Sequence, residues 1–326
     1  MLTSRFSVQC VIALCMFIVG TRVVAQTTSV GDPPKVPMPP CRVGSPTAWD
    51  QCIGSQILKS GRYIGQFKQG QRSGRGKLTE PNGDEYDGEW SDGRRNGYGV
   101  TTYFNGDRYE GHWKADKRDG RGTYRFNNGD TYDGDFSVDM RSGSGICTRS
   151  DGRVYRGQFL AGKFQGDGRE ELPSGTVYEG KWEGGELRSG VMTHVSGLRY
   201  EGMFKTVDQK HVFEGQGVLR FVQGDRFEGD FSAGVGKGRG TYFFKTGDIF
   251  EGDFESGLMS GRGRLTFKDK RVFIGSVKQG KANGDGVLYS ESGRILASGY
   301  WENNRLLVSE TFDSGRFPFK KSEVRE

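Results

Sequence analysis

The sequence is poor in aliphatic residues and in proline. Hydrophobic residues make up 33% of its 326 positions, and 40 residues are aromatic (5 Trp, 13 Tyr and 22 Phe). A chain of this composition cannot bury the thick aliphatic core of a doubly wound α/β enzyme. Only 9 Pro are present and Gly does not recur at every third position, which excludes collagen. Global disorder is excluded as well, because so many rings allow the chain to bury apolar surface.

The residue patterns of common active sites are also lacking. No Gly-x-Ser-x-Gly elbow and no P-loop occurs. The three histidines are scattered without paired cysteines, which argues against a zinc site: His112, His194 and His211. Acidic pairs such as Asp133/Asp135 are better explained by cross-strand ion pairs, with partners at Arg121, Arg239 and Arg262. We therefore expect neither an enzyme nor a bound metal or cofactor.

Net charge is low for the length. Lys and Arg number 47 and Asp and Glu 41, a formal charge of +6, or +4 without Arg5 and Arg22. This is too little for nucleic acid to be the expected partner. Any electrostatic role must come from the placement of charges along the fold.

The first 25 residues have the pattern of a secretory leader. Arg5 precedes an apolar run from Cys10 to Gly20, and 23–25 supply small or β-branched residues before a cut. Eleven apolar residues are too few to span a bilayer. We expect a cleaved signal peptide at 1–25, with an uncleaved anchor as the alternative. The protein is then exported, to the periplasm or cell envelope, or is secreted.

Export makes the remaining cysteines interpretable. Cys41 and Cys52 bracket a short loop and are predicted to form a disulfide, whereas Cys147 is left over. Residues 26–40 hold five of the nine prolines and are typical of an extended linker.

An internal repeat determines the fold. An aromatic residue recurs mostly every 23 positions and begins each of ten units: Tyr63, Tyr86, Tyr109, Tyr132, Tyr155, Tyr178, Tyr200, Phe227, Phe250 and Phe273. Gly follows two positions later in all ten units, and a second aromatic four positions later in nine, with Val277 as the exception. A Gly-x-Gly comes next, as in Gly97/Gly99. Unit six runs one residue short and unit seven carries four extra residues.

This pattern closely resembles the MORN (membrane occupation and recognition nexus) repeat, and the resemblance covers nearly all of the chain after the linker. The segment 49–54 also resembles the half-repeat that opens exported bacterial arrays of the family, with Cys52 in place of the first Gly of Gly-x-Gly. The resemblance implies a non-catalytic module that attaches to proteins or to membrane surfaces. Some relatives append a catalytic domain, but only about 18 residues follow the last half-unit here.

The strand period agrees with the repeat. Alternate residues of a strand share a face, so Tyr86, Gly88 and Trp90 lie on one side and Asp87 and Glu89 on the other. Dipeptides such as Asn82-Gly83 and Asn105-Gly106 are typical hairpin turns, found also at 128–129 and 151–152. We predict an all-β fold, an elongated single-layer antiparallel twisted sheet of about ten tandem hairpins. The predicted parts are a half-repeat cap at 41–62, ten repeats at 63–296, and a half-repeat cap with a tail at 297–326.

Hairpin tips supply the first candidate site. Tips of the first five units fall on one edge of the sheet and carry basic residues, whereas Asp84, Asp107 and Asp130 lie on the other edge. The predicted binding rail is Arg72, Arg94, Arg95, Lys117, Arg118, Arg141 and Lys163. It would dock on anionic lipid or on an acidic protein. The alternative is that polar tips are rich in Lys and Arg for solubility alone.

Unit seven supplies a second candidate. Its longer tip contains Asp208, Lys210 and His211 and is a candidate recognition loop, with a tolerated insertion as the alternative.

Cys147 is expected to be a buried, inert thiol. The apolar tail residues 306–308 and 317–319 either fold back over the last strand or form an end-to-end homodimer. The sequence thus predicts an exported protein-binding scaffold, with peripheral binding of anionic lipid as the alternative.

Overall fold

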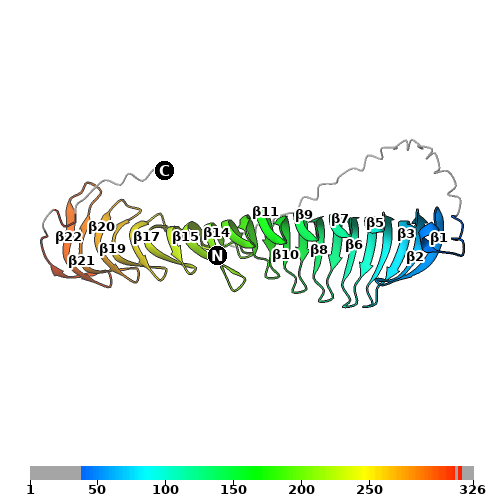
Figure 1. The fold of residues 1–326 in the computed structure, drawn as a ribbon. Helices are drawn as coiled ribbons and strands as arrows, with labels where there is room; N and C mark the ends of the chain where they lie inside the picture. Colours follow the sequence, from blue (N-terminus) through cyan, green and yellow to red (C-terminus); the bar gives the residue numbers. More distant parts are fainter. Residues whose placement is uncertain (1–37, 313–314, 318–326) are drawn as a thin grey trace, which may run out of the picture. The chain divides into compact units, whose positions relative to one another are not determined.

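The computed structural model describes residues 38–312 and 315–317. The predicted signal peptide, nearly all of the predicted linker and the last nine residues lie outside the described part. The described residues from Pro39 onward belong to one structural unit, shown as a ribbon in Figure 1. No helix among the described residues is long and apolar enough to cross a membrane.

The described residues form one antiparallel sheet of 23 strands in which each strand pairs with its neighbours in sequence, as Figure 1 shows. The one helical turn among them is the short 3-10 turn η1 (Pro46–Ala48). The all-β prediction is confirmed. The strands are β1 (Cys52–Leu58), β2 (Gly61–Lys68), β3 (Gln71–Thr79), β4 (Glu85–Ser91), β5 (Arg94–Thr102), β6 (Arg108–Lys114), β7 (Lys117–Arg125), β8 (Thr131–Ser137), β9 (Met140–Thr148), β10 (Val154–Leu160), β11 (Lys163–Glu171), β12 (Val177–Glu183), β13 (Glu186–Thr193), β14 (Arg199–Val207), β15 (Lys210–Arg220), β16 (Arg226–Ser232), β17 (Val235–Phe243), β18 (Ile249–Glu255), β19 (Leu258–Thr266), β20 (Val272–Lys278), β21 (Lys281–Tyr289), β22 (Ile295–Glu302) and β23 (Arg305–Ser309).

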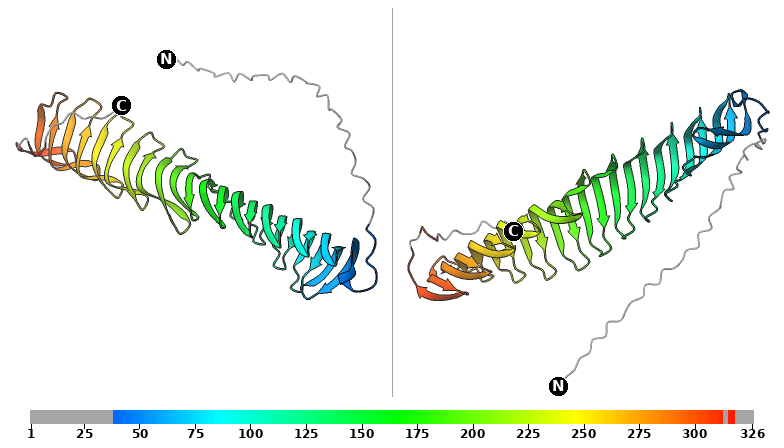
Figure 2. Two further views of the ribbon diagram at one scale, coloured as in Figure 1. Left: turned by 45° about the horizontal axis from the view of Figure 1, so that its top comes forward. Right: turned by 60° about the horizontal axis from the view of Figure 1, so that its bottom comes forward.

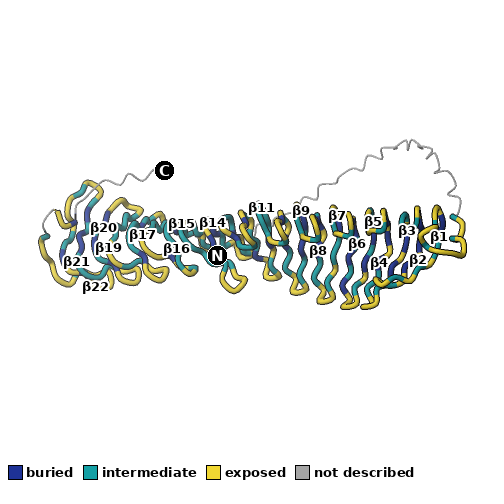
Figure 3. The backbone as a smooth tube through the Cα atoms, in the orientation of Figure 1, coloured by how far each residue is buried: buried dark blue, intermediate teal, exposed yellow. Residues whose placement is uncertain are grey.

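Each unit buries its rings and glycines on one face, which we call the inner face. In β4, Tyr86, Gly88 and Trp90 are buried, whereas Asp87 and Glu89 are exposed on the outer face. This is the alternation expected of a strand. Figure 3 shows the result along the chain, with buried bands on the strands and exposed residues at both edges.

Two glycines in each unit make room for the first ring. Gly88 and Gly99 face each other across β4 and β5, and the Tyr86 ring lies over both. A Cβ atom on Gly99 would lie 2.4 Å from the Tyr86 hydroxyl oxygen, which is closer than nonbonded atoms approach. The Tyr86 hydroxyl donates a hydrogen bond to the Glu89 carbonyl at 2.8 Å, and burial raises its pKa. The glycines therefore seat the ring on the backbone.

The first glycine of Gly-x-Gly has a different role, because it bends the second strand. Gly97 lies in a bulge opposite Glu89 and has a φ of +93°, a conformation that favours glycine. Extra residues on one strand make it bend and twist. The strands consequently curl around the inner face, and the twist of the sheet is visible in Figure 2.

Rings of successive units pack edge to face. The Trp90 ring centroid lies 5.2 Å from those of both Tyr86 in its own unit and Tyr63 in the preceding one. This geometry is favoured for aromatic pairs. Apart from unit six, where His211 contacts both Tyr178 and Trp182, the pattern reaches Phe254, whose ring contacts Phe227 and Phe250. It is interrupted at Val277, which brings no ring to Phe250.

Two kinds of turn form the two edges. The turns inside each unit have two residues, both with positive φ, such as Asp92-Gly93, and we call their row the tip edge. The turns between units are five-residue loops from β3 onward, such as 103–107, and they form the loop edge. The predicted Asn-Gly turns are present there, but only the glycine has positive φ, as in Gly106. The reason is that the loop closes through a turn from Tyr103 to Gly106 rather than through a two-residue hairpin.

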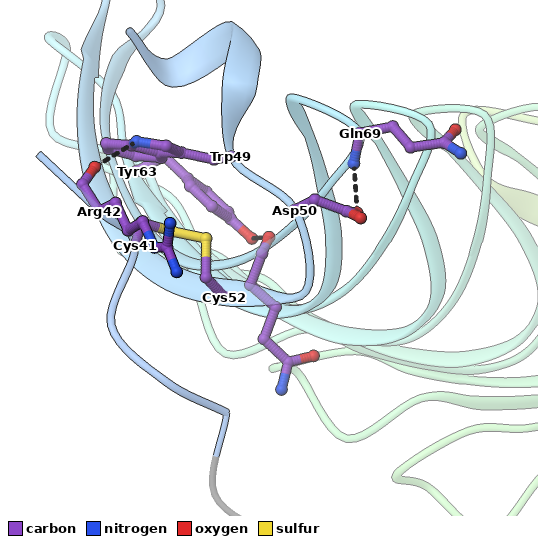
Figure 4. Close-up of a disulfide and its surroundings, with 8 residues drawn as sticks. Cys41, Arg42, Trp49, Asp50, Cys52, Tyr63 and Gln69 are labelled. Carbon is purple, nitrogen blue, oxygen red and sulfur yellow. Dashed lines mark hydrogen bonds between the residues drawn. A yellow bond between two sulfur atoms is a disulfide. The ribbon is translucent and has the colours of Figure 1, made fainter. Parts of the chain in front are cut away.

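A half-repeat cap covers the first strand of the sheet. Cys41 and Cys52 form the predicted disulfide, with a Cα–Cα distance of 4.9 Å, as Figure 4 shows. The Trp49 ring packs edge-on against Phe67 and its indole N–H donates to the Arg42 carbonyl. Cys52 is the register partner of Phe67. In the next unit the first glycine of Gly-x-Gly, Gly74, is in the same way the partner of the second aromatic, Trp90. The cap thus extends the ring packing by half a unit.

The described part of the tail folds back onto the outer face. Phe317 is buried against Val272, Val287 and Tyr289 of β20 and β21, and the Tyr289 hydroxyl donates to the Phe317 carbonyl at 2.6 Å. Of the two alternatives for the tail, these residues adopt the folded-back one, over β20 and β21 rather than over β23. The end-to-end homodimer stays a prediction.

Candidate binding edge

The predicted basic rail lies at the start of the second strand of each unit, directly after the two-residue tip. Its members fall into two classes because successive residues of a strand face opposite sides. Arg94, Lys117 and Lys163 are exposed. The other four are half-buried and point to the inner face: Arg72, Arg95, Arg118 and Arg141. The rail is therefore brought together along one edge, but only part of it faces solvent.

The four half-buried arginines cover the rings of the inner face. The Arg72 guanidinium carbon lies 4.3 Å from the Trp90 ring centroid, and that of Arg95 lies 4.4 Å from Trp113. Such cation–π contacts stabilise by about 0.5–2 kcal/mol depending on burial. Burial lowers the pKa of the Arg72 guanidinium. These side chains are held by the core and are poorly placed to bind a partner.

The same arginines link each tip to the next. The Nη2 atom of Arg118 donates to the Asp139 carbonyl at 3.0 Å, and Nη2 of Arg141 donates to the Gly162 carbonyl at 2.8 Å. The backbone adds a parallel bond, because the Asp139 N–H donates to the Arg118 carbonyl at 2.9 Å. The spacing of neighbouring tips is thereby fixed.

The acidic residues of the loop edge have an equivalent role. The carboxylates of Asp84, Asp107 and Asp130 each accept a backbone N–H from the next loop at 2.8 Å. Asp107 also accepts the Tyr124 hydroxyl at 2.8 Å. The N–H of Ser150 lowers the pKa of Asp130. The predicted acidic rail is thus a series of links between loops.

From unit four onward exposed apolar residues also appear at the tip edge. Val138, Met140 and Leu160 are exposed neighbours at the tips of units four and five, with 57%, 50% and 61% of their surface accessible. Val207, Val235 and Leu258 continue the series. Val138 has a φ of +47°, which is rare for a β-branched residue. The repeat spacing alone places Met140, Val235 and Leu258 at hairpin tips, whereas Val138 and Leu160 are found only once the two turn residues of each unit are identified.

The candidate recognition loop separates into exposed and buried residues. Asp208 and Lys210 are exposed at the tip of the β14–β15 hairpin. His211 points into the core, where its Nε2 lies 2.7 Å from Glu170 Oε2 and its ring packs on Tyr178 and Trp182. The side chains of His211 and Glu170 are only 6% and 9% exposed. The longer hairpin therefore helps fill the core over the short unit six.

Chemistry elsewhere in the described residues is sparse. No group of three or more His, Cys, Asp or Glu residues that could hold a metal ion occurs among them. Cys147 is buried, and burial raises the pKa of its thiol, as expected for an inert cysteine. Arg121 pairs with Asp133 at 2.9 Å and Arg239 with Asp253 at 3.8 Å, as predicted. The Arg262 side chain instead lies over the Phe317 ring.

Comparison with known proteins identifies the repeats. The MORN repeat model matches nine segments: 63–85, 86–108, 109–131, 132–152, 155–177, 209–226, 227–249, 250–270 and 273–293. The unmatched stretch between 177 and 209 contains the short unit six and the start of the long unit seven. No curated protein matches the chain.

Solved structures of low similarity include the TCP10 domain of CPAP from Danio rerio. It is 14% identical, with a TM-score of 0.37, over 69% of this chain and 99% of that domain. The same domain in complex with a peptide of Danio rerio STIL is 13% identical, with a TM-score of 0.24, over 76% of this chain and 98% of that one. The matched repeats, in contrast, cover more than half of the chain and coincide with the observed hairpins, so this protein belongs to the MORN repeat family.

Proposed function

We propose that this protein is a non-catalytic binding scaffold of the cell envelope that holds a protein partner along its tip edge. The proposal rests on the way successive tips are connected. Hydrogen bonds from inward arginines such as Arg118, together with backbone hydrogen bonds, link each tip to the next. Two strands per unit place neighbouring tips about 10 Å apart. A partner would therefore meet a preorganised row of contacts, which lowers the entropy lost on binding.

The composition of the edge favours a partner with an acidic and an apolar part. Arg94, Lys117 and Lys163 supply exposed positive charge in units two, three and five. Val138 and Met140 supply exposed apolar surface in unit four, within the same stretch. The twist of the sheet turns successive tips away from any one plane (Figure 2), and a protein surface can follow such a path.

Export is part of the proposal. Disulfides persist in oxidising compartments, and the Cys41–Cys52 pair has the geometry of a disulfide. The leader expected at 1–25 gives the route. The family is generally non-enzymatic, and its arrays mediate contacts with proteins or membranes.

An anionic membrane is the second candidate, and a specific observation favours it. The exposed Val138, Met140 and Leu160 lie between Lys117 and Lys163 on the tip edge. Apolar tips flanked by lysines suit the boundary between lipid headgroups and acyl chains, where each basic residue contributes about 1 kcal/mol.

Charge reversal at the exposed tips tests both candidates. The triple variant Arg94→Glu, Lys117→Glu and Lys163→Glu leaves the inward arginines in place. A matched control reverses three exposed residues away from the tip edge: Arg75, Arg156 and Lys268. Both variants change the net charge equally. Each protein is used to capture partners from an envelope extract, and is sedimented with anionic and neutral liposomes at two salt concentrations.

Loss of a captured protein in the tip variant alone supports the proposal. Loss of salt-sensitive liposome binding in the tip variant alone supports the membrane candidate instead. Equal behaviour of the wild type and both variants in both assays would reject the tip edge as the docking surface.

A further inference from the structure

An apolar cavity of about 340 Å³ opens on the inner face between units nine and ten and the last half-repeat. It lies among strands β18 to β22 at the end of the sheet that Figure 1 labels β20 to β22. Its walls are mostly rings and aliphatic side chains, with Phe250, Phe273, Trp301, Met259, Leu265 and Leu288 among them. Arg271 and Asn304 are its polar members. This size is within the usual range of small-molecule sites.

The first cause of the cavity is Val277. In unit three the equivalent position holds Trp113, whose ring centroid lies 5.4 Å from Tyr86 of the preceding unit. Val277 is four residues after its unit's first aromatic, as Trp113 is, but it brings no ring to Phe250. Valine is much smaller than tryptophan, and Val277 lines the cavity where a tryptophan ring would otherwise extend.

The second cause is Ala282. It occupies the position of Arg118, nine residues after the first aromatic. The guanidinium carbon of Arg118 lies 5.4 Å from the Phe136 ring and covers it. Ala282 has no side chain long enough to cover Trp301, the ring equivalent to Phe136. These two small residues line the cavity together with Phe273 and Trp301, which are 4% and 8% exposed.

A cation, Arg271, stands at the loop edge beside the cavity. In unit three the hydroxyl of Tyr124, which lies on the inner face, donates a hydrogen bond to the Asp107 carboxylate. An anion therefore stands at the loop edge there. The position equivalent to Asp107 in unit nine is Arg271, which lines the cavity. The cavity therefore has a cation where unit two has an anion, and Arg153 and Arg294 occupy the same repeat position after units four and ten.

We propose that this cavity binds a small aromatic carboxylate, with its ring against Phe273 and Trp301 and its carboxylate on Arg271. Edge-to-face contacts like those along the rest of the inner face would hold the ring. Arg271 is the one charged residue among those lining the cavity, which selects an anion over a cation.

Arg271 can pair with a ligand without losing its present partner. Its Nε lies 2.7 Å from Asp269 Oδ2, with the two side chains 47% and 54% exposed. An exposed pair of this kind is weak. The guanidinium has five N–H donors in a planar fork, so its terminal nitrogens can still donate to a carboxylate.

Titration with indole-3-propionate tests the proposal on the full chain, by calorimetry. We expect saturable binding with one site, and binding of the neutral analogue 3-methylindole that is about tenfold weaker. Arg271→Gln is expected to remove the preference for the carboxylate while keeping binding of 3-methylindole. This outcome separates recognition of the anion from filling of the cavity.

Variants that fill the cavity provide the decisive comparison. Ala282→Arg and Val277→Trp restore the residues found in unit three and are expected to abolish binding of both probes. Ser292→Arg adds the same guanidinium at an exposed loop position outside the cavity and should leave binding unchanged. Absence of saturable binding to the wild type would overturn the proposal, as would equal binding to the wild type and to both filled variants, each checked for folding by circular dichroism.

Discussion

Replacement of Arg118 by alanine is expected to destabilise the array much more than replacement of the adjacent Lys117. Arg118 is 21% exposed, donates to the Asp139 carbonyl at 3.0 Å and lies 5.1 Å from the Tyr124 ring centroid. One hydrogen bond contributes about 1 kcal/mol and a partly buried cation–π contact about 1–2 kcal/mol. The expected loss is therefore about 2–3 kcal/mol.

Lys117 is the matched control, because it pairs with the same acidic residue from the solvent side. Its Nζ lies 2.8 Å from Asp139 Oδ2, but 56% of its side chain is exposed. Exposed ion pairs contribute about 0–1 kcal/mol. Lys117→Ala should therefore change the free energy of unfolding by less than about 1 kcal/mol.

Urea unfolding followed by circular dichroism measures the global effect of both variants. Hydrogen exchange measures the local one, since repeat arrays can open unit by unit. In Arg118→Ala the Asp139 N–H, which donates to the residue 118 carbonyl, should exchange faster than in the Lys117→Ala protein. Equal stability and equal exchange in the two variants would refute the structural role assigned to the inward arginines.

Three further outcomes follow from the fold. Gly99→Ala should destabilise by more than 1 kcal/mol in thermal unfolding, because the new Cβ would collide with the Tyr86 hydroxyl, 2.4 Å away. Cys41→Ser with Cys52→Ser should cost about 2–3 kcal/mol by urea unfolding, as expected for a short closed loop, and reduction of the wild type should reproduce the loss. The pKa of Asp130 is lowered in the folded state, so its contribution is present above the unfolded value near pH 4 and is lost as the pH falls through the folded one. The stability difference between the wild type and Asp130→Asn should therefore shrink on acidification, and a difference independent of pH would contradict the assignment.

The sequence predicted the repeat and its faces because the strand period is simple. Tyr86, Gly88 and Trp90 share a face in any strand of that register, so burial of all three followed from spacing alone. The inward direction of the Arg95 side chain did not follow from the spacing. The bulge at Gly97 shifts the second strand until Arg95 pairs directly with Trp90, which turns its side chain inward.

The inward direction of His211 in the candidate recognition loop did not follow from the sequence for a related reason. The residues added to unit seven lengthen β14 and β15, and Val207 pairs with Lys210 at the tip. His211 then reaches Glu170, 41 residues earlier, a contact that spacing within one unit cannot reveal. Insertions in a repeat array change which units touch, so their effect depends on the curl of the whole sheet.

Photo-crosslinking in the producing cell tests the central claim most directly. A photoreactive phenylalanine analogue is placed at Lys117 or Leu160 on the tip edge, or at Arg156 on the outer face, all exposed positions. The tip edge as docking surface requires discrete adducts with another protein from Lys117 and Leu160 and none from Arg156. Adducts from Arg156 alone would contradict it and place the partner on the outer face.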